Sequence, residues 1–277
     1  MYRHFRNMLE ERWSLGKFLC VGLDSDFEKI PDARVGGVIE TLYRFNRKII
    51  DETHDIVCAY KPNAAFFEGC GSGGLQALRD IVTYIHKVAP NVPVIFDAKR
   101  GDIGNTNEGY MTYAFGYLGM DAITVNPYMG GEALKPFLDR KDVGIFVLCR
   151  TSNPGAGEFQ DIDVAPLTEE PLPLYQYIAQ RVAKHWNTGG NCCLVVGATR
   201  PDELREVRAI VGDMPILIPG IGAQGGDLDK TVMAGKDSRG RGMIINSSRG
   251  IIFAKDPRGE AEKLDASIRA CLSPVSS

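Results

Sequence analysis

Residues 94–106 carry the side chains of this chain that are best placed to do chemistry. Two carboxylates and two cations occur within six positions, directly after a short apolar run. The run predicts a buried strand, and Gly101 predicts its end and frees Asp102 from it. Because side chains two apart on a strand face the same way, we expect Asp97 and Lys99 to lie together, with Cα atoms roughly 6.6 Å apart. We interpret this strand end as part of a functional pocket rather than as a structural ion pair.

Apolar runs and helical periods around this stretch predict how it is positioned. Eight runs of strand length occur, separated by segments with helical spacing. The runs are continuous rather than alternating, which is typical of parallel strands buried on both faces. Eight such units over about 250 residues fit a single α/β domain spanning residues 1–277, a (β/α)8 TIM barrel with residues 1–16 as an extra N-terminal helix. A doubly wound sheet is the alternative fold, but it would not need eight similar units.

The boundaries of these elements follow from the same patterns. The expected strands are residues 18–24, 56–63, 94–99, 122–126, 143–149, 192–197, 215–219 and 242–246. The expected helices are residues 35–53, 75–88, 105–118, 131–138, 174–186, 201–211, 227–234 and 259–272. Residues 151–173 are rich in proline, glycine and acidic side chains, and they predict a long loop that is functional or a surface insertion.

Polar side chains end several of these strands. The first strand ends in Asp24, the second in Lys61, and the third in Asp97 and Lys99, while the fifth leads into residues 150–155. In a TIM barrel the carboxyl ends of all eight strands meet at one mouth, where active sites lie. Each charge alone has a structural explanation, such as capping a turn. Their convergence on one rim predicts a catalytic pocket.

The loops after the seventh and eighth strands, residues 219–226 and 246–250, are rich in glycine or serine. In this fold these two loops commonly hold a phosphate group, which backbone N–H groups at helix N-termini bind without side chains. Arg249 adds a permanently charged, bidentate donor. We therefore expect a phosphorylated substrate rather than two tight turns and a surface arginine.

The charges at the third strand predict a decarboxylation. Asp97 and Asp102 together would repel a substrate carboxylate, and Lys99 between them would stay protonated because its neighbours are anions. A protonated lysine beside a departing carboxylate suits a reaction that loses CO2 and then protonates carbon. We expect no metal site, since none of the four histidines lies at a strand end.

Composition argues against several classes of function. The net charge is −3 with signs mixed along the chain, so no basic stripe favours nucleic acid. No apolar run approaches about 18 residues, so we expect no membrane span, and the charged N-terminus lacks the apolar core of a signal peptide. The seven cysteines show no C-x-x-C spacing, and five lie in or beside apolar runs. We therefore expect reduced, structural thiols in a cytoplasmic protein.

These motifs, taken in order, resemble those of the orotidine 5′-phosphate decarboxylase family, in its longer bacterial branch. The resemblance is strongest over residues 97–106, Asp-Ala-Lys-Arg-Gly-Asp-Ile-Gly-Asn-Thr, and covers nearly the whole barrel. It also includes residues 22–24, 61–63, 151–155, 219–226 and 248–250. The Asp-x-Lys-x-x-Asp core alone is shared with related sugar-phosphate enzymes, whereas the full combination is specific. Segments 66–74 and 155–173 depart from the family's pattern.

The resemblance implies a cofactor-free conversion of orotidine 5′-phosphate to uridine 5′-phosphate and CO2, the last step of UMP synthesis. It implies that Lys99 protonates C6 of the pyrimidine, that Asp97 lies against the leaving carboxylate, and that Lys61 and Asp102 complete the charge network. It also implies a homodimer with shared active sites. The substrate contacts it implies are Asp24 and Lys61 on the ribose, Ser152 on the pyrimidine, Gln224 and Arg249 on the phosphate, Pro219 in the pocket, and Asp102, Ile103 and Thr106 across the dimer interface.

Three other functions stay open. A metal-dependent ketose-phosphate decarboxylase or aldolase of the same suprafamily shares Asp97, Lys99 and Asp102, but such relatives carry a metal-binding carboxylate where this chain has Lys61. A catalytically silent phosphosugar-binding barrel would bind without turnover, although every expected catalytic group is present. A Schiff-base aldolase would need a nucleophilic Lys99, which the flanking carboxylates disfavour.

Overall fold

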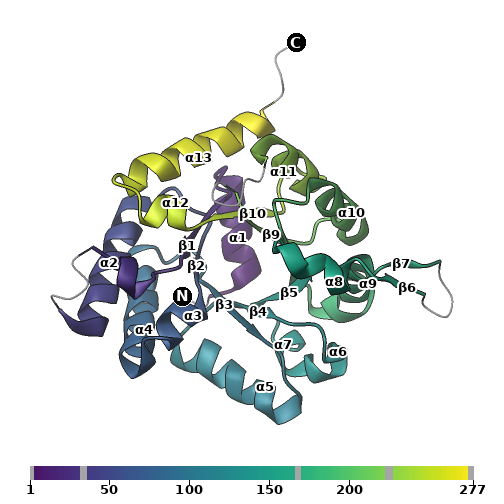
Figure 1. Ribbon diagram of the computed structural model, residues 1–277, viewed down its shortest axis with the longest axis horizontal. Coiled ribbons are helices and arrows are strands. Elements are labelled where there is room, and N and C mark those ends of the chain that lie inside the picture. Colours follow the sequence, from purple (N-terminus) through teal and green to yellow (C-terminus); the bar gives the residue numbers. More distant parts are fainter. Residues whose placement is uncertain (1–2, 32–35, 166–169, 222–226, 274–277) are drawn as a thin grey trace.

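The computed structural model describes residues 3–31, 36–165, 170–221 and 227–273, and its main strands form a ring (Figure 1). Eight parallel strands follow the order β2-β1-β10-β9-β8-β5-β4-β3. The ring closes between β2 and β3 through two parallel bridges, Tyr60 to Val94 and Asn63 to Asp97. The strands are β1 (Leu19–Leu23), β2 (Ala59–Pro62), β3 (Ile95–Arg100), β4 (Ala122–Val125), β5 (Gly144–Arg150), β8 (Cys192–Val196), β9 (Ile216–Pro219) and β10 (Met243–Ser247). The TIM barrel expected from the apolar runs is confirmed.

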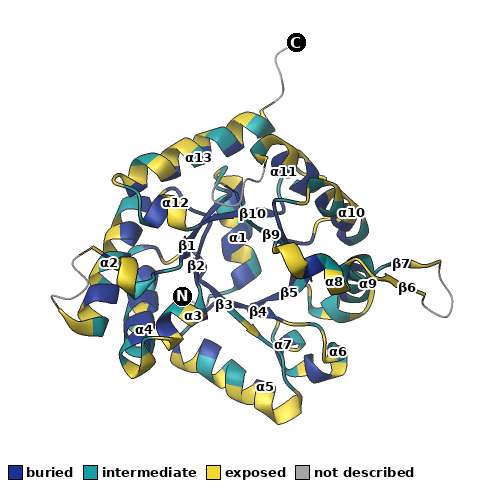
Figure 2. Cartoon of the chain, viewed as in Figure 1, coloured by how far each residue is buried: buried dark blue, intermediate teal, exposed yellow. Residues whose placement is uncertain are grey.

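Helices cover the outside of the ring, with their inner faces buried and their outer faces exposed (Figure 2). Aspartate side chains cap the N-termini of two of these helices. Asp227 accepts a hydrogen bond from Lys230 N, and Asp256 accepts one from Gly259 N. The helices are α2 (Gly37–Thr53), α3 (Ala64–Glu68), α4 (Gly71–Val88), α5 (Gly104–Met111), α6 (Gly130–Ala133), α7 (Lys135–Leu138), α9 (Leu174–Arg181), α10 (Pro201–Val211), α11 (Leu228–Gly235), α12 (Arg249–Ile252) and α13 (Pro257–Leu272). π-Helical turns extend α5 over Thr112–Tyr117 and α9 over Val182–Trp186. Of the helices described, none is long and apolar enough to cross a membrane.

The extra N-terminal helix α1 (Phe5–Ser14) covers the end of the barrel where the strands begin. Phe5 packs edge-to-face on Phe146 near the start of β5, with ring centroids 5.5 Å apart. The indole N–H of Trp13 donates to the carbonyl oxygen of Met243, at the start of β10, over 2.8 Å. Because α1 covers this end, the carboxyl-terminal mouth is the open one.

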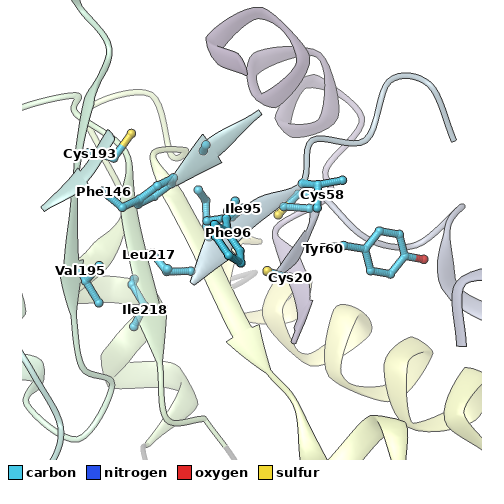
Figure 3. Packing of buried hydrophobic residues seen from close by; sticks show 14 of the residues in the cluster. Cys20, Cys58, Tyr60, Ile95, Phe96, Phe146, Cys193, Val195, Leu217 and Ile218 are labelled. Carbon is cyan, nitrogen blue, oxygen red and sulfur yellow. The ribbon is translucent and has the colours of Figure 1, made fainter. Parts of the chain in front are cut away.

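The interior of the barrel is filled by apolar side chains from many strands. Figure 3 shows Phe96, Phe146 and Leu217, which come from three different strands, among these buried residues. Five cysteines belong to the same core as free thiols, as the sequence predicts: Cys20, Cys58, Cys149, Cys192 and Cys193. Free cysteine packs as a small hydrophobe in such surroundings.

Two segments are more ordered than the sequence indicates. Helix α4 begins at Gly71 rather than at 75, and it packs so closely on α3 that a Cβ at Gly74 would lie 2.0 Å from the carbonyl oxygen of Phe67. The long loop expected over 151–173 is wrong, because that stretch holds a 3-10 turn (Pro154–Ala156), α8 (Gly157–Gln160) and a hairpin of β6 (Asp163–Val164) and β7 (Leu172–Pro173). An ion pair that joins Arg150 to Asp161 ties this insertion to the barrel.

Candidate active site

A cavity of about 310 Å³ opens at the carboxyl-terminal mouth of the barrel, within the size range of small-molecule sites. Its walls come from the ends of the barrel strands and the loops that follow them. The residues singled out in the sequence that line it are Asp24, Lys61, Asp97, Lys99, Ser152, Pro219 and Arg249. The structure therefore brings together side chains that are as much as 225 positions apart, from Asp24 to Arg249.

Four charged side chains form an alternating chain across this cavity. Lys61 Nζ donates to Asp97 Oδ2 over 2.8 Å, and Lys99 Nζ donates to Asp97 Oδ1 over 2.6 Å. Lys61 Nζ also lies 3.7 Å from Asp24 Oδ1. Two anions and two cations nearly cancel, and mutual pairing is what allows charges to stay ionised in a site shielded from water.

Burial and pairing act in opposite directions on the two innermost charges. Burial by itself would raise the pKa of the Asp97 carboxyl, but the charges of Lys61 and Lys99 and their hydrogen bonds outweigh it and hold that pKa well below its usual range. Burial would likewise lower the pKa of Lys61, but Asp97 and Asp24 outweigh it, and the pKa is raised above its usual value. Both groups are therefore ionised at neutral pH.

The backbone at Lys99 departs from strand geometry. The pairing of β3 with β4 shifts register between Phe96 and Arg100, and Lys99 has φ +48°, the left-handed region that costs a non-glycine residue about 1–2 kcal/mol. Among the described residues, no other non-glycine has a positive φ. Asp97 and Lys99 are in contact as expected, but strand alternation is not the reason. The shifted register turns the lysine toward the carboxylate, and its side chain stays 49% exposed.

Asp102, Ile103 and Thr106 do not line the cavity of their own chain. They lie beyond β3, where Gly101 passes so close to β4 that a Cβ there would lie 2.8 Å from the carbonyl oxygen of Asn126. The buried Asn107 accepts a hydrogen bond from Asp102 N over 2.9 Å and fixes this turn. Ile103 is 55% exposed and Thr106 is exposed, so the segment points outward.

Other cavity residues carry no sequence motif that marks them. Thr124, Leu148 and Val195 lie near the ends of β4, β5 and β8 and line the cavity, and only their place at a strand end could have indicated them. Two buried oxygen atoms in the cavity wall, Asp24 Oδ1 and Asn246 Oδ1, have no hydrogen-bond partner. Both are available to donors on a ligand. Gln224, expected on the phosphate, lies outside the described residues.

A larger hollow of about 920 Å³ between α2 and α12 shares Arg249 with the mouth. Its other cations are paired with acids close by in sequence: Lys29 with Asp26, Arg44 with Glu40 and Lys48 with Glu52. The smaller cavity is the candidate active site, because its charges converge from different strands and two of them, Lys61 and Asp97, are largely buried. Over the described part of the chain, no group of three or more His, Cys, Asp or Glu side chains could hold a metal ion.

Fold and cavity together define a class: a TIM barrel with a charged pocket at its carboxyl-terminal mouth, the position of active sites in barrel enzymes. Comparison with known families identifies the particular group. Residues 17–264 match the "Orotidine 5'-phosphate decarboxylase / HUMPS family", and the chain belongs to that family.

Individual relatives agree with this assignment. The orotidine 5′-phosphate decarboxylase of Janthinobacterium sp. (strain Marseille) is 51% identical over 237 residues, which cover 86% of this chain and 84% of that protein. The structure of Leishmania donovani OMP decarboxylase is 40% identical, with a TM-score of 0.86 over 97% of this chain and 98% of the other. Leishmania donovani UMP synthase is 42% identical with a TM-score of 0.88, and this chain spans 57% of that longer protein.

Proposed function

We infer that this protein is a carboxy-lyase of pyrimidine biosynthesis, which converts orotidine 5′-phosphate to uridine 5′-phosphate and CO2. Family membership supports the reaction, and one observation in the site carries the chemistry. The ammonium group of Lys99 lies 2.6 Å from the carboxylate of Asp97 in the mouth of the barrel. An anion and a proton donor are thus adjacent where a substrate carboxylate would leave and a carbon would be protonated.

The residue roles follow from charge. The bond between C6 and the carboxylate breaks, CO2 departs, and the electron pair stays on C6. The proton on Lys99 Nζ then moves to C6. Asp97, ionised because its pKa is lowered by Lys61 and Lys99 against the effect of burial, repels the substrate carboxylate and holds the two lysines in place. No step needs a cofactor or a metal ion.

The remaining cavity residues suit the other parts of a nucleotide. Asp24 Oδ1 is buried without a hydrogen-bond partner, and a ribose hydroxyl would satisfy it, with Lys61 beside it. Ser152 and Pro219 line the cavity on the side of β5 and β9, where they would contact the pyrimidine. Arg249 opens α12 at the rim, where it would bind the phosphate together with Gln224.

We further propose a homodimer in which each site uses Asp102, Ile103 and Thr106 of the other chain. These residues do not line the cavity of their own chain, and the Lys99 side chain in that cavity is 49% exposed. Tyr128, on the neighbouring β4–α6 loop, is a large aromatic side chain that is 91% exposed. A second copy would cover this surface. A cytoplasmic location fits the free thiols.

A direct assay tests the reaction. Loss of orotidine 5′-phosphate absorbance is followed with and without a chelator, for the wild type, Lys99→Ala and the control Lys263→Ala, an exposed lysine on α13. We expect turnover that the chelator does not affect, none with Lys99→Ala, and unchanged turnover with the control. Binding of uridine 5′-phosphate should persist in Lys99→Ala. Near-normal turnover in Lys99→Ala, or loss of activity with the chelator, would refute the mechanism.

Mixed dimers test the shared site. Lys99→Ala and Asp102→Ala, each expected to be nearly inactive, are unfolded, mixed in equal amounts and refolded. In a mixed dimer one site collects both changes, and the other receives Lys99 from one chain and Asp102 from its partner. Random assortment makes about half of the dimers mixed, so about a quarter of wild-type activity should return. If mixed dimers are confirmed by mass and no activity returns, Asp102 serves its own chain.

A further inference from the structure

Thr124 occupies the position where β4 faces the irregular part of β3. Phe96 pairs with Ile123 and Arg100 pairs with Val125, so the three residues 97–99 stand opposite Thr124 alone. Thr124 lines the cavity, yet only 1% of its surface is exposed. Its hydroxyl is therefore held within the wall of the site, next to the residues that the register shift displaces.

The hydroxyl of Thr124 connects both groups of the proposed reaction centre. It accepts a hydrogen bond from the backbone N–H of Lys99 over 2.9 Å and donates one to Asp97 Oδ1 over 3.1 Å. These directions are unambiguous, because the amide can only donate, the ionised carboxylate can only accept, and the hydroxyl has one proton. The same Oδ1 accepts the hydrogen bond from Lys99 Nζ. One side chain thus joins the backbone of the lysine to the carboxylate that its ammonium group contacts.

We propose that Thr124 is a positioning residue, which holds Asp97 and the left-handed backbone of Lys99 in the geometry from which the lysine delivers its proton. The hydroxyl replaces the strand hydrogen bond that the shifted register removes from Lys99 N–H, so it stabilises a conformation that a lysine would otherwise leave. The proposal depends on the roles given above to Asp97 and Lys99, and it adds the group that aligns them.

Replacing the hydroxyl without changing the shape isolates this contribution. Thr124→Val keeps the volume, leaves Lys99 N–H without an acceptor and removes one donor from Asp97. A displacement of about 1 Å at a reacting group can cost about 100-fold in rate, so we expect kcat to fall roughly 10- to 100-fold. KM should change by less than about threefold, because Thr124 binds protein groups rather than the substrate. Thr124→Ser keeps the hydroxyl and should retain most of kcat.

The experiment measures kcat, KM and Tm for both variants together with Thr53→Val. Thr53 is a matched control, since it is a buried threonine on α2 whose hydroxyl donates to Ile49 O, away from the cavity. Its valine variant should lower Tm and leave kcat unchanged, as any structural loss of a buried hydroxyl would. Thr124→Ala replaces Thr124→Val if the latter does not fold, with the same expectation for kcat.

Two results would overturn the proposal. One is a Thr124→Val enzyme with wild-type kcat, and the other is a Thr124→Ser enzyme as slow as Thr124→Val, which would assign the effect to packing. Lys99→Ala, assayed in parallel, separates this test from that of the reaction. If Lys99→Ala is inactive and Thr124→Val is fully active, the role of Thr124 alone is wrong. If Lys99→Ala turns over normally, the proposed reaction centre itself is wrong.

Discussion

Removal of the Asp161 carboxylate should destabilise the protein more than removal of the guanidinium that it binds, although Asp161 is the more exposed partner. Arg150 is fully buried at the end of β5, whereas the side chain of Asp161 is 44% exposed. Their closest atoms, Arg150 Nε and Asp161 Oδ1, lie 2.9 Å apart, and Arg150 Nη2 donates to Oδ2 over the same distance. The two losses of stability differ because removing Asp161 leaves a buried charge unpaired, whereas removing Arg150 leaves a partly exposed one.

The structure sets the size of each effect. Asp161→Ala leaves a guanidinium in a buried position without its anion, and loss of one partner from a buried pair costs about 3–5 kcal/mol. We expect the lower end, about 3 kcal/mol, because water can reach the side on which Asp161 is exposed. Arg150→Met keeps the apolar stem and leaves a carboxylate that water can solvate, so we expect a loss of about 1–2 kcal/mol from the missing hydrogen bonds.

Urea unfolding at pH 7 and one fixed protein concentration measures both free energies, since the proposed dimer would make stability depend on concentration. Asp55→Ala is the matched control. It breaks the exposed pair of Asp55 with Arg258 and should cost less than about 1 kcal/mol. The reasoning is refuted if Asp161→Ala costs no more than Arg150→Met.

The kinetic constants of Asp161→Ala and Arg150→Met should also change, because the insertion that these residues hold is connected to the cavity. Arg150 Nη1 donates to Thr151 O over 2.9 Å, and the Gln160 side chain accepts from Thr151 N over 2.8 Å. Residues 151–153 line the cavity, so a loosened insertion should raise KM more than it lowers kcat. A change in kcat alone would contradict this positioning role.

Three further outcomes are expected. Arg249→Ala should reduce kcat/KM for the phosphorylated substrate by an amount equivalent to about 2–3 kcal/mol and hardly affect a substrate without the phosphate; equal losses on both would place Arg249 elsewhere. Burial alone would raise the pKa of Asp121, but its hydrogen bonds with Arg3 and its interaction with His86, 3.8 Å away, outweigh burial and lower that pKa, so its stabilising effect is present above about pH 4 and is lost as the pH falls through the lowered value. In urea unfolding, Asp121→Asn should cost about 2 kcal/mol at pH 7 and show a weaker loss of stability toward pH 3 than the wild type; parallel pH profiles would contradict this. In a titration with Ellman's reagent, only Cys70 and Cys271 should react in the native protein, because they are partly exposed whereas the five core cysteines are buried; reaction of more than two thiols before unfolding would show that the core opens.

The sequence by itself determined the barrel and most of the rim of its mouth. Continuous apolar runs predict strands that are buried on both faces, and such runs can be recognised from neighbouring residues in the sequence alone. Once eight such runs are counted, topology brings their carboxyl ends together, so Asp24, Lys61 and Asp97 could be assigned to one cavity before any contact was known. The residues that resemble the family's motifs were likewise identified from the sequence alone.

Only the tertiary structure decided the fine geometry of the site. The left-handed backbone at Lys99 depends on a register shift against β4, and Thr124 gains its role from the strand opposite rather than from its sequence neighbours. The helical turns within 151–173 are tied to the barrel by contacts such as the Arg150–Asp161 ion pair and the hydrogen bond from Thr151 N to Gln160, and Asp102 lies outside its own cavity, beyond the point where Gly101 passes close to β4. Periodicity reports which residues are buried, but it carries no information on register or on pairs that meet through space, because those depend on elements folded together from distant parts of the chain.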